Sequence, residues 1–188
     1  MSHEPLLEPL LRRLRVRRVL PVLSRHPGCR LLDVGCGATA ALLRAVEPYV
    51  GSAIGIDRKA PALASGKLST IAAALDDTLP FPDASFDVVS LLAVLEHLAQ
   101  PEAIVGEIHR VLTPGGEAVL TVPSKAAKPV LEFLAFRLGV VSRAEILDHK
   151  RYYGRDSLRQ LFVDAGFRVD AHRYFQLGMN NFLVATRI

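Results

Sequence analysis

The chain has 188 residues, enough for one domain to build a well-buried core. Half of the residues are hydrophobic, 22% are charged and the formal net charge is +4, which is typical of a soluble globular protein and gives no reason to expect a nucleic-acid partner. Two cysteines, Cys29 and Cys36, do not make a disulfide framework, and no apolar run reaches the ~18–20 residues of a membrane span. We therefore expect a cytoplasmic protein.

The first expected element is an amphipathic helix over 6–24, bent or ended by Pro21. Its apolar residues recur at helical spacing, at Leu7, Leu10, Leu11 and Leu14. Much of the basic surplus lies in the same segment, at Arg12, Arg13, Arg15, Arg17 and Arg18. We interpret these arginines mainly as the solvated side of the helix.

Apolar strands then alternate with helices over most of the chain. The expected strands cover 30–34, 52–57, 69–74, 86–92 and 117–122. The helices expected between them cover 39–48, 61–68 and 102–112. Because alternation of buried strands with helices is typical of a parallel sheet covered on both faces, the sequence predicts an α/β fold.

The last third of the chain breaks this alternation. A helix is expected over 155–165, with Gly166 as its C-cap, followed by strands over 167–175 and 182–188. Only a short turn separates these two strands, and so short a connection can join antiparallel neighbours only. We therefore expect the sheet to end in a hairpin.

A glycine turn follows the first strand, and an acid ends the second. Gly35 and Gly37 can bring the backbone close to a ligand, and Asp57 can accept hydrogen bonds from ribose hydroxyls. This pairing is how α/β sheets hold nucleosides. Because Gly35-x-Gly37-x-x-Ala40 also fits the dinucleotide fingerprint, an NAD(P)-dependent oxidoreductase remains an alternative at this point.

Four stretches in this order resemble the class I S-adenosylmethionine-dependent methyltransferases, particularly the small type-11-like bacterial domains. They are LLDVGCG at 31–37, LPFPDASFDVV at 79–89, VLEHL at 94–98 and RVLTPGG at 110–116. The resemblance implies a doubly wound three-layer sandwich whose seven-stranded, mostly parallel sheet has the order 3-2-1-4-5-7-6 and an antiparallel last strand. It also implies one Rossmann-like domain over 1–188, with an N-terminal helix over about 6–24 and an apolar insertion over about 125–148.

Carried over by position, the resemblance assigns a set of S-adenosylmethionine-binding residues. The methionine part would meet Asp33, Gly35, Cys36, Gly37 and the backbone of Leu92, and the nucleoside would meet Asp57, Arg58, Leu75 and Asp76. Two positions depart from the family pattern. Thr39 stands where the family usually has a third glycine, and Ala74 stands where an acid commonly ends the third strand.

Methyl transfer from a sulfonium depends mainly on alignment with water excluded, although a hydroxyl or phenol acceptor would also use a general base. The candidate catalytic residues are Glu96 and His97, just past the fourth strand, and His149, in a loop that often borders the acceptor pocket of such enzymes. Some relatives bind a divalent metal here through Glu-x-x-Glu-His. Because Ala93 stands at the first acid, we expect no metal site.

The segment 129–142 is almost continuously apolar, and two interpretations stay open. It is either a helix buried against the sheet, or a lid, a weak membrane-surface contact or a dimer face. The lid would suit a small lipophilic or aromatic acceptor of unresolved nucleophile. A catalytically silent S-adenosylmethionine-binding domain is a further alternative, and both a monomer and a homodimer are compatible with the sequence.

Overall fold

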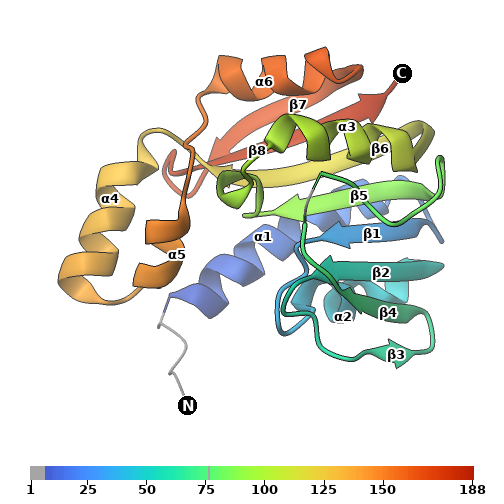
Figure 1. The fold of residues 1–188 in the computed structure, drawn as a ribbon, viewed down its shortest axis with the longest axis horizontal. Helices are drawn as coiled ribbons and strands as arrows, with labels where there is room; N and C mark the ends of the chain where they lie inside the picture. Colours follow the sequence, from blue (N-terminus) through green and yellow to red (C-terminus); the bar gives the residue numbers. More distant parts are fainter. Residues whose placement is uncertain (1–6, 76) are drawn as a thin grey trace.

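The computed structural model describes residues 7–75 and 77–188, whose centre is a sheet of eight strands (Figure 1). In chain order the strands are β1 (Arg30–Val34), β2 (Ser52–Asp57), β3 (Ala64–Ser65), β4 (Leu68–Ala72), β5 (Phe86–Leu92), β6 (Leu112–Pro123), β7 (Phe167–Phe175) and β8 (Asn180–Arg187). Their order across the sheet is β3-β4-β2-β1-β5-β6-β8-β7.

The sheet is parallel through its centre and antiparallel at its ends. β4, β2, β1, β5 and β6 pair in parallel, whereas β8 runs antiparallel to both β6 and β7. When the two-residue β3 is set aside, this is the predicted order 3-2-1-4-5-7-6 with an antiparallel last strand. The predicted α/β fold class is therefore confirmed.

Helices cover both faces of the sheet. α1 (Glu8–Leu23) and α2 (Ala41–Val46) pack on one face, and α3 (Pro101–Val111) and α6 (Arg155–Asp164) pack on the other. A short 3₁₀ turn, η1 (Glu47–Tyr49), follows α2. The molecule thus has the three layers expected of a doubly wound sheet.

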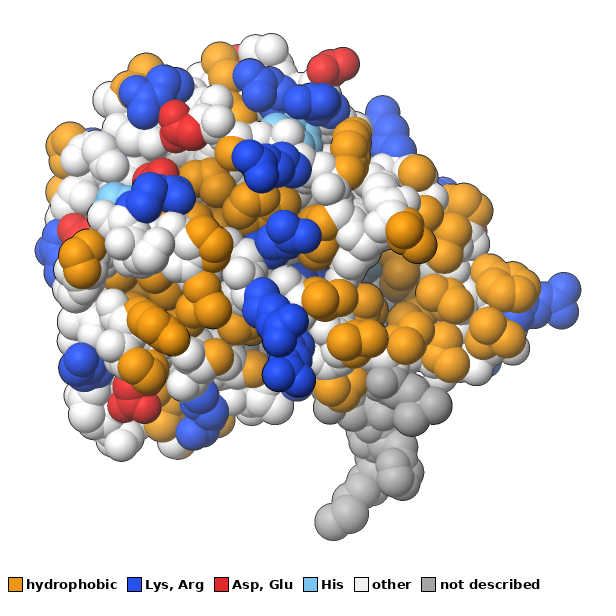
Figure 2. Space-filling view, turned by 180° about the vertical axis from the view of Figure 1, so that it is seen from behind, with side chains coloured by type: hydrophobic (Ala, Val, Ile, Leu, Met, Phe, Trp, Pro, Cys, Tyr) orange, Lys and Arg blue, Asp and Glu red, His pale blue; other side chains and the backbone are white. Residues whose placement is uncertain are grey.

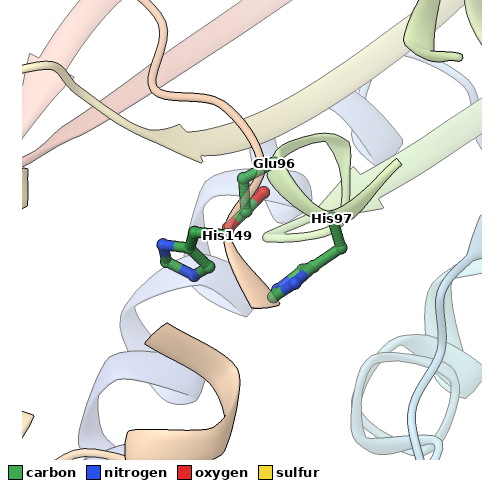
Figure 3. A group of neighbouring side chains, drawn as sticks. All are labelled: Glu96, His97 and His149. Atoms are coloured by element: carbon green, nitrogen blue, oxygen red, sulfur yellow. The ribbon is translucent and has the colours of Figure 1, made fainter. Parts of the chain in front are cut away.

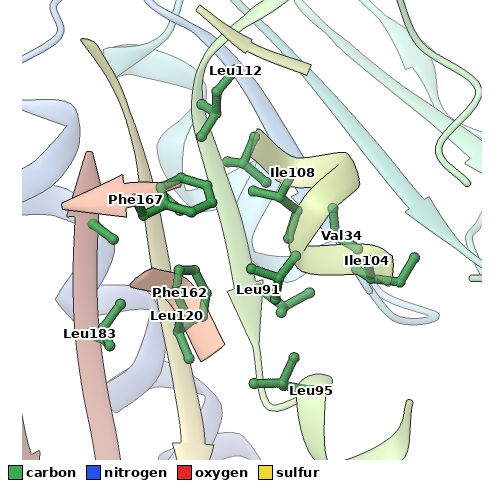
Figure 4. Close-up of a cluster of buried hydrophobic side chains, with 14 of the residues drawn as sticks. Val34, Leu91, Leu95, Ile104, Ile108, Leu112, Leu120, Phe162, Phe167 and Leu183 are labelled. Carbon is green, nitrogen blue, oxygen red and sulfur yellow. The ribbon is translucent and has the colours of Figure 1, made fainter. Parts of the chain in front are cut away.

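Two hydrophobic clusters form the core, one on each face. Because successive residues of a strand point to opposite faces, Leu31 packs with α1 and α2, whereas Leu32 packs with α3 and α6. Val88 and Val89 divide between the two clusters in the same way. Figure 4 shows the cluster on the α3 side, where Phe162 reaches the strands. Burial on both faces explains why these strands are apolar without interruption.

The helix predicted over 61–68 is wrong, because this segment contains β3 and a turn at Gly66, whose φ is +57°. The hydroxyl of Thr70 donates a hydrogen bond to the carbonyl oxygen of Pro61 and accepts one from the backbone N–H of Leu63 at 3.0 Å. These contacts come from the neighbouring strand β4, so they hold the segment extended.

Two other elements differ from expectation. α1 continues through Pro21 to Leu23, and Leu10, expected in its apolar stripe, is 54% exposed. The residues of α1 that are buried lie in its second half, because only that half covers the sheet. β6 begins at Leu112 instead of 117, since the Pro-Gly-Gly stretch lies within the strand next to an irregularity in its pairing with β5.

The segment after β6 forms α4 (Ala127–Phe133), the π-helical η3 (Leu134–Leu138) and α5 (Arg143–Asp148), here called the α4–α5 unit. It lies beyond the carboxyl ends of β1 and β5 (Figure 1). Phe133 is 55% exposed and Leu138 57%. The interpretation of 129–142 as a helix buried against the sheet is therefore wrong, because the unit lies beyond the edge of the strands.

Seen from behind, the projecting part of the molecule carries many hydrophobic side chains, with basic side chains beside them (Figure 2). The exposed apolar residues of the α4–α5 unit are Val130, Phe133, Phe136, Leu138 and Leu147. Among the described helices, none combines the length and apolar character needed to cross a membrane.

Candidate functional site

The carboxyl ends of β1, β2 and β5 lie side by side and place most of the predicted cofactor residues at one edge of the sheet. Asp33 on β1 is in register with Gly55 on β2 and with Ser90 on β5. The strands then end near Gly35, Asp57 and Leu92. In a doubly wound sheet, this edge at the reversal of winding is where ligands bind.

Gly35 and Gly37, the two glycines of the turn after β1, differ in what surrounds them. Gly35 has a φ of +78°, and a Cβ on it would lie 2.2 Å from Cγ2 of Val94. Gly37 has a φ of +67°, but no atom lies within 4 Å of the place its Cβ would take. Gly35 is therefore packed against its neighbour, whereas the space beside Gly37 is open. The buried Cys36 contacts Gly55 and fills the turn.

Thr39 fits this turn without strain. The left-handed conformation falls on the next residue, Ala40, whose φ is 46°. Thr39 is exposed, and its carbonyl oxygen accepts a hydrogen bond from Nε of Arg44 at 3.2 Å. The departure from the usual third glycine therefore leaves the turn intact.

Asp57 occupies the position expected of a ribose-binding acid. Its Oδ2 accepts the backbone N–H of Gly37 at 3.1 Å, and its Oδ1 accepts that of Lys59 at 2.7 Å. Each carboxylate oxygen keeps a further lone pair for a hydroxyl donor. Together with the open space beside Gly37, these two acceptor oxygens fit the ribose of the nucleoside in S-adenosylmethionine.

Asp33 lies beneath the turn and is fully enclosed. Ser90 donates its hydroxyl to Oδ1 of Asp33 at 2.8 Å. Burial, with the nearby charge of Asp57, raises the pKa of Asp33 to about 7, against the lowering effect of Ser90. The same burial raises the pKa of the Cys36 thiol to about 12, so this cysteine is a poor nucleophile.

The other predicted cofactor residues surround the same edge. Arg58 follows Asp57 and is exposed, whereas Leu75 and Leu92 are half-buried. Asp76, predicted at the adenine, lies outside the described residues. The adenine contacts of Arg58 and Leu75 and the backbone contact of Leu92 stay predictions.

The three candidate catalytic residues come together beyond the end of β5 (Figure 3). Glu96 and His97 belong to the 3₁₀ turn η2 (Leu95–His97), which follows β5, and His149 follows α5. The imidazole rings of His97 and His149 are 4.8 Å apart between centroids. Each ring is also held by a neighbour: Nδ1 of His97 donates to Asp148 at 3.0 Å, and Nδ1 of His149 lies 3.1 Å from the hydroxyl of Tyr152.

The carboxyl group of Glu96 is buried, and its Oε2 has no hydrogen-bond partner among the described residues. Burial raises the pKa of Glu96 to about 7, although the nearby charge of His97 lowers it. Burial also lowers the pKa of His149 to about 4, with further lowering by His97 and Arg15. At neutral pH, His149 is therefore a neutral imidazole beside a carboxyl group that can exchange its proton.

One ligand atom each from Glu96, His97 and His149 lies within 4.8 Å of the other two, which is a spacing that a cation could use. The sequence pattern predicted no metal site because Ala93 stands where the pattern has an acid. It could not show that His149 comes close to Glu96 and His97. Metal-independent chemistry stays our prediction.

A pocket of about 530 Å³ opens next to His149. Its lining comes from the turn before α4, from the α4–α5 unit and from the loop that follows it, and comprises Lys125, Lys128, Glu132, Phe136, Ile146, Leu147, His149, Lys150, Arg151 and Tyr152. Of the three candidate catalytic residues, His149 is the one that lines it. This places a proton acceptor beside a space large enough for a small molecule.

Sequence reasoning missed two residues here. Arg15 was assigned to the solvated side of α1, yet it is half-buried, and its charge affects the pKa values of both Glu96 and His149. Tyr152 holds the ring of His149. Arg15 carries no local signal, because the groups that its charge affects are far away in the chain. Tyr152 is only three positions from His149, but the loop between them has no regular periodicity that would predict their contact.

Comparison with known proteins gives consistent results. A family model described as a methyltransferase domain matches residues 7–172. The chain is 30% identical over 174 residues to the ubiquinone/menaquinone biosynthesis C-methyltransferase UbiE of Neisseria meningitidis, covering 77% of this chain and 69% of that protein. It is 29% identical over 178 residues to a demethylmenaquinone methyltransferase of Staphylococcus aureus, covering 80% and 73%.

Solved structures agree on the fold. An S-adenosylmethionine-dependent methyltransferase from Mesorhizobium loti matches with a TM-score of 0.67 at 19% identity, covering 90% of this chain and 98% of that one. None of these three relatives is described as an oxidoreductase, so they do not favour the dinucleotide alternative.

Proposed function

Because the chain belongs to the methyltransferase-domain family and is an S-adenosylmethionine-dependent enzyme, we propose that it methylates a small lipophilic or aromatic acceptor bound beside His149. The observation that carries this proposal is the lining of the 530 Å³ pocket, to which Phe136, Ile146 and Leu147 contribute together with that imidazole. Apolar walls with a few polar groups are typical of small-molecule sites. The two curated relatives, whose names point to quinone-type acceptors, support a ring-shaped acceptor.

The cofactor residues proposed for this reaction are those at the sheet edge. Asp57 would accept the ribose hydroxyls, and the turn at Gly37 leaves open space for the rest of the molecule. When bound, S-adenosylmethionine supplies a methyl group that is already activated on a sulfonium. The protein then has mainly to align the acceptor and exclude water.

His149 is the proposed proton acceptor for a hydroxyl or phenol. In the tautomer whose Nδ1–H donates to the hydroxyl of Tyr152, Nε2 holds the lone pair that can take the proton. Its low pKa keeps it unprotonated at physiological pH. Glu96 would act through His149, because its buried carboxylate could stabilise the imidazolium that forms.

Transfer of a labelled methyl group to a panel of phenols, quinols and aliphatic alcohols tests the proposal. Phe136→Ser should lower kcat/KM for aromatic acceptors about 10–100-fold, the loss expected for one buried aromatic contact. Phe133→Ser is a matched control, because Phe133 lies in the same unit, is 55% exposed and does not line the pocket.

Equal effects of the two substitutions, in folded proteins, would contradict the assignment of the pocket. Absence of turnover across the whole panel, with the cofactor bound, would favour the catalytically silent alternative instead.

A further inference from the structure

The pocket beside His149 has an unbalanced charge. Four of its lining residues are cationic and one is acidic, which leaves a surplus of three positive charges: Lys125, Lys128, Lys150 and Arg151 against Glu132. The formal net charge of the entire chain is only +4. A modestly basic protein thus concentrates positive charge around one small space.

Three of these cations have no ion-pair partner in the part of the chain that the structure describes. Arg151 donates to Glu102 at 2.8 Å, whereas Lys125, Lys128 and Lys150 form no ion pair with any described residue. The lysines come from two segments of the chain, since Lys125 and Lys128 lie just before and within the first turn of α4 and Lys150 lies in the loop after α5. Because all three line one pocket, their ammonium groups can attract one anionic group together.

The same pocket has an apolar wall. Phe136, Ile146 and Leu147 line it together with Tyr152, so a bound molecule would meet hydrophobic surface and ammonium groups at once. A neutral lipophilic molecule would leave the lysines without a partner, and a small inorganic anion would leave the apolar wall unused. A molecule with an aromatic or aliphatic body and one acidic group uses both.

We propose that the acceptor of this enzyme is an amphipathic organic anion, whose carboxylate, sulfonate or phosphate is bound by Lys128 and Lys150 while its apolar body packs on Phe136. The inference rests on the proposed function, because it names the class of acceptor for the same pocket. Lys128 and Lys150 act in binding and specificity and not in the methyl transfer itself.

Two fluorescent probes that differ by one anionic group test this. 8-Anilinonaphthalene-1-sulfonate carries a sulfonate, and N-phenyl-1-naphthylamine has the same rings without it. The double substitution Lys128→Gln with Lys150→Gln should weaken sulfonate-probe binding about tenfold and leave neutral-probe binding within about twofold. Phe136→Ser should weaken both probes, and Arg173→Gln, an exposed cation on β7, should change neither.

Sulfonate-probe affinity that is unchanged in the lysine variant, or that falls equally for both probes, would overturn the proposal. Insensitivity of both probes to Phe136→Ser would overturn it as well. These titrations need neither cofactor nor turnover. Failure of the proposed methyl transfer would therefore appear separately, as a lack of labelled product while the lysine effect persists.

Discussion

The backbone N–H of Lys150 donates to the carbonyl oxygen of Glu96 at 2.8 Å, which ties the loop after α5 to the turn after β5. These residues are more than fifty positions apart in the chain, and the contact brings His149 next to Glu96. Further along, the carbonyl of Tyr153 accepts a hydrogen bond from Asn181 at 3.1 Å, which fixes the other end of the loop to β8. The position of the loop that carries His149 therefore depends on a backbone–backbone hydrogen bond and on one from the side chain of Asn181.

The buried carboxyl of Glu96 should make stability depend on pH. Its pKa is about 7 in the folded protein against 4.5 as the reference value, so the folded state binds the extra proton between these limits. The contribution of Glu96 to the free energy of unfolding is then present below pH 4.5 and lost as pH rises through 7. The lowered pKa of His149 has the opposite effect on stability. Because the folded state resists protonation of this ring, the free energy of unfolding falls as pH drops from 6.5 to 4.

Urea denaturation of the wild type and Glu96→Gln at pH 5 and pH 8 isolates the Glu96 contribution. The stability advantage of the wild type over the variant should fall by about 1–3 kcal/mol between these pH values. A difference that stays constant with pH would show that Glu96 titrates normally.

The two histidines of the cluster should differ in their kinetic effect. His149→Gln should lower kcat about 10²-fold or more if a hydroxyl acceptor is used, since it removes the base that lines the pocket. His97→Gln should lower it less than tenfold, because His97 does not line the pocket and contacts Asp148 and the His149 ring. Steady-state kinetics with circular dichroism as a folding control separate the two, and the reverse ranking would contradict the assignment.

The two glycines of the cofactor turn should respond differently to a Cβ. Gly35→Ala combines a φ of +78° with a clash against Val94, whereas Gly37→Ala has only the backbone strain. We expect thermal and urea unfolding to show Gly35→Ala as the more destabilising by about 1–3 kcal/mol. In a Val94→Ala background this excess should shrink. Equal destabilisation in both backgrounds would argue against the Val94 contact.

Metal-independence is testable despite the geometry of the cluster. Dialysis against EDTA should leave the rate of methyl transfer within about twofold of the untreated enzyme. Loss of activity that Mg²⁺ or Mn²⁺ restores in the wild type, but not in Glu96→Gln, would instead identify a cation held by Glu96, His97 and His149.

Local sequence signals were enough to group the proposed cofactor residues at one edge of the sheet. The turn at Gly35 and Gly37 follows a short apolar strand and needs little from the rest of the chain. Asp57 likewise ends a strand whose bounds were predicted as they are observed. Parallel pairing of β1, β2 and β5 then brings these residues together, so recognising the fold class was enough to group them.

The features that the sequence did not predict depend on contacts between segments far apart in the chain. The helix expected over 61–68 was wrong because Thr70 holds that segment from β4. The burial of Arg15 and the approach of His149 depend on how α1 and the α4–α5 unit lie beyond the sheet. The apolar run 129–142 left burial and exposure of its aromatic side chains both open, since periodicity says nothing about the surface that a helix meets.

Calorimetric titration with S-adenosylhomocysteine tests most directly whether Asp57 and the glycine turn hold the cofactor. The wild type and Asp164→Asn, an exposed acid on α6, should bind with equal affinity, whereas Asp57→Asn should bind about 10–100-fold more weakly, because it loses a charged acceptor for the ribose hydroxyls. NADH should give no heat of binding. Unchanged affinity in Asp57→Asn, or binding of NADH in place of S-adenosylhomocysteine, would contradict this account.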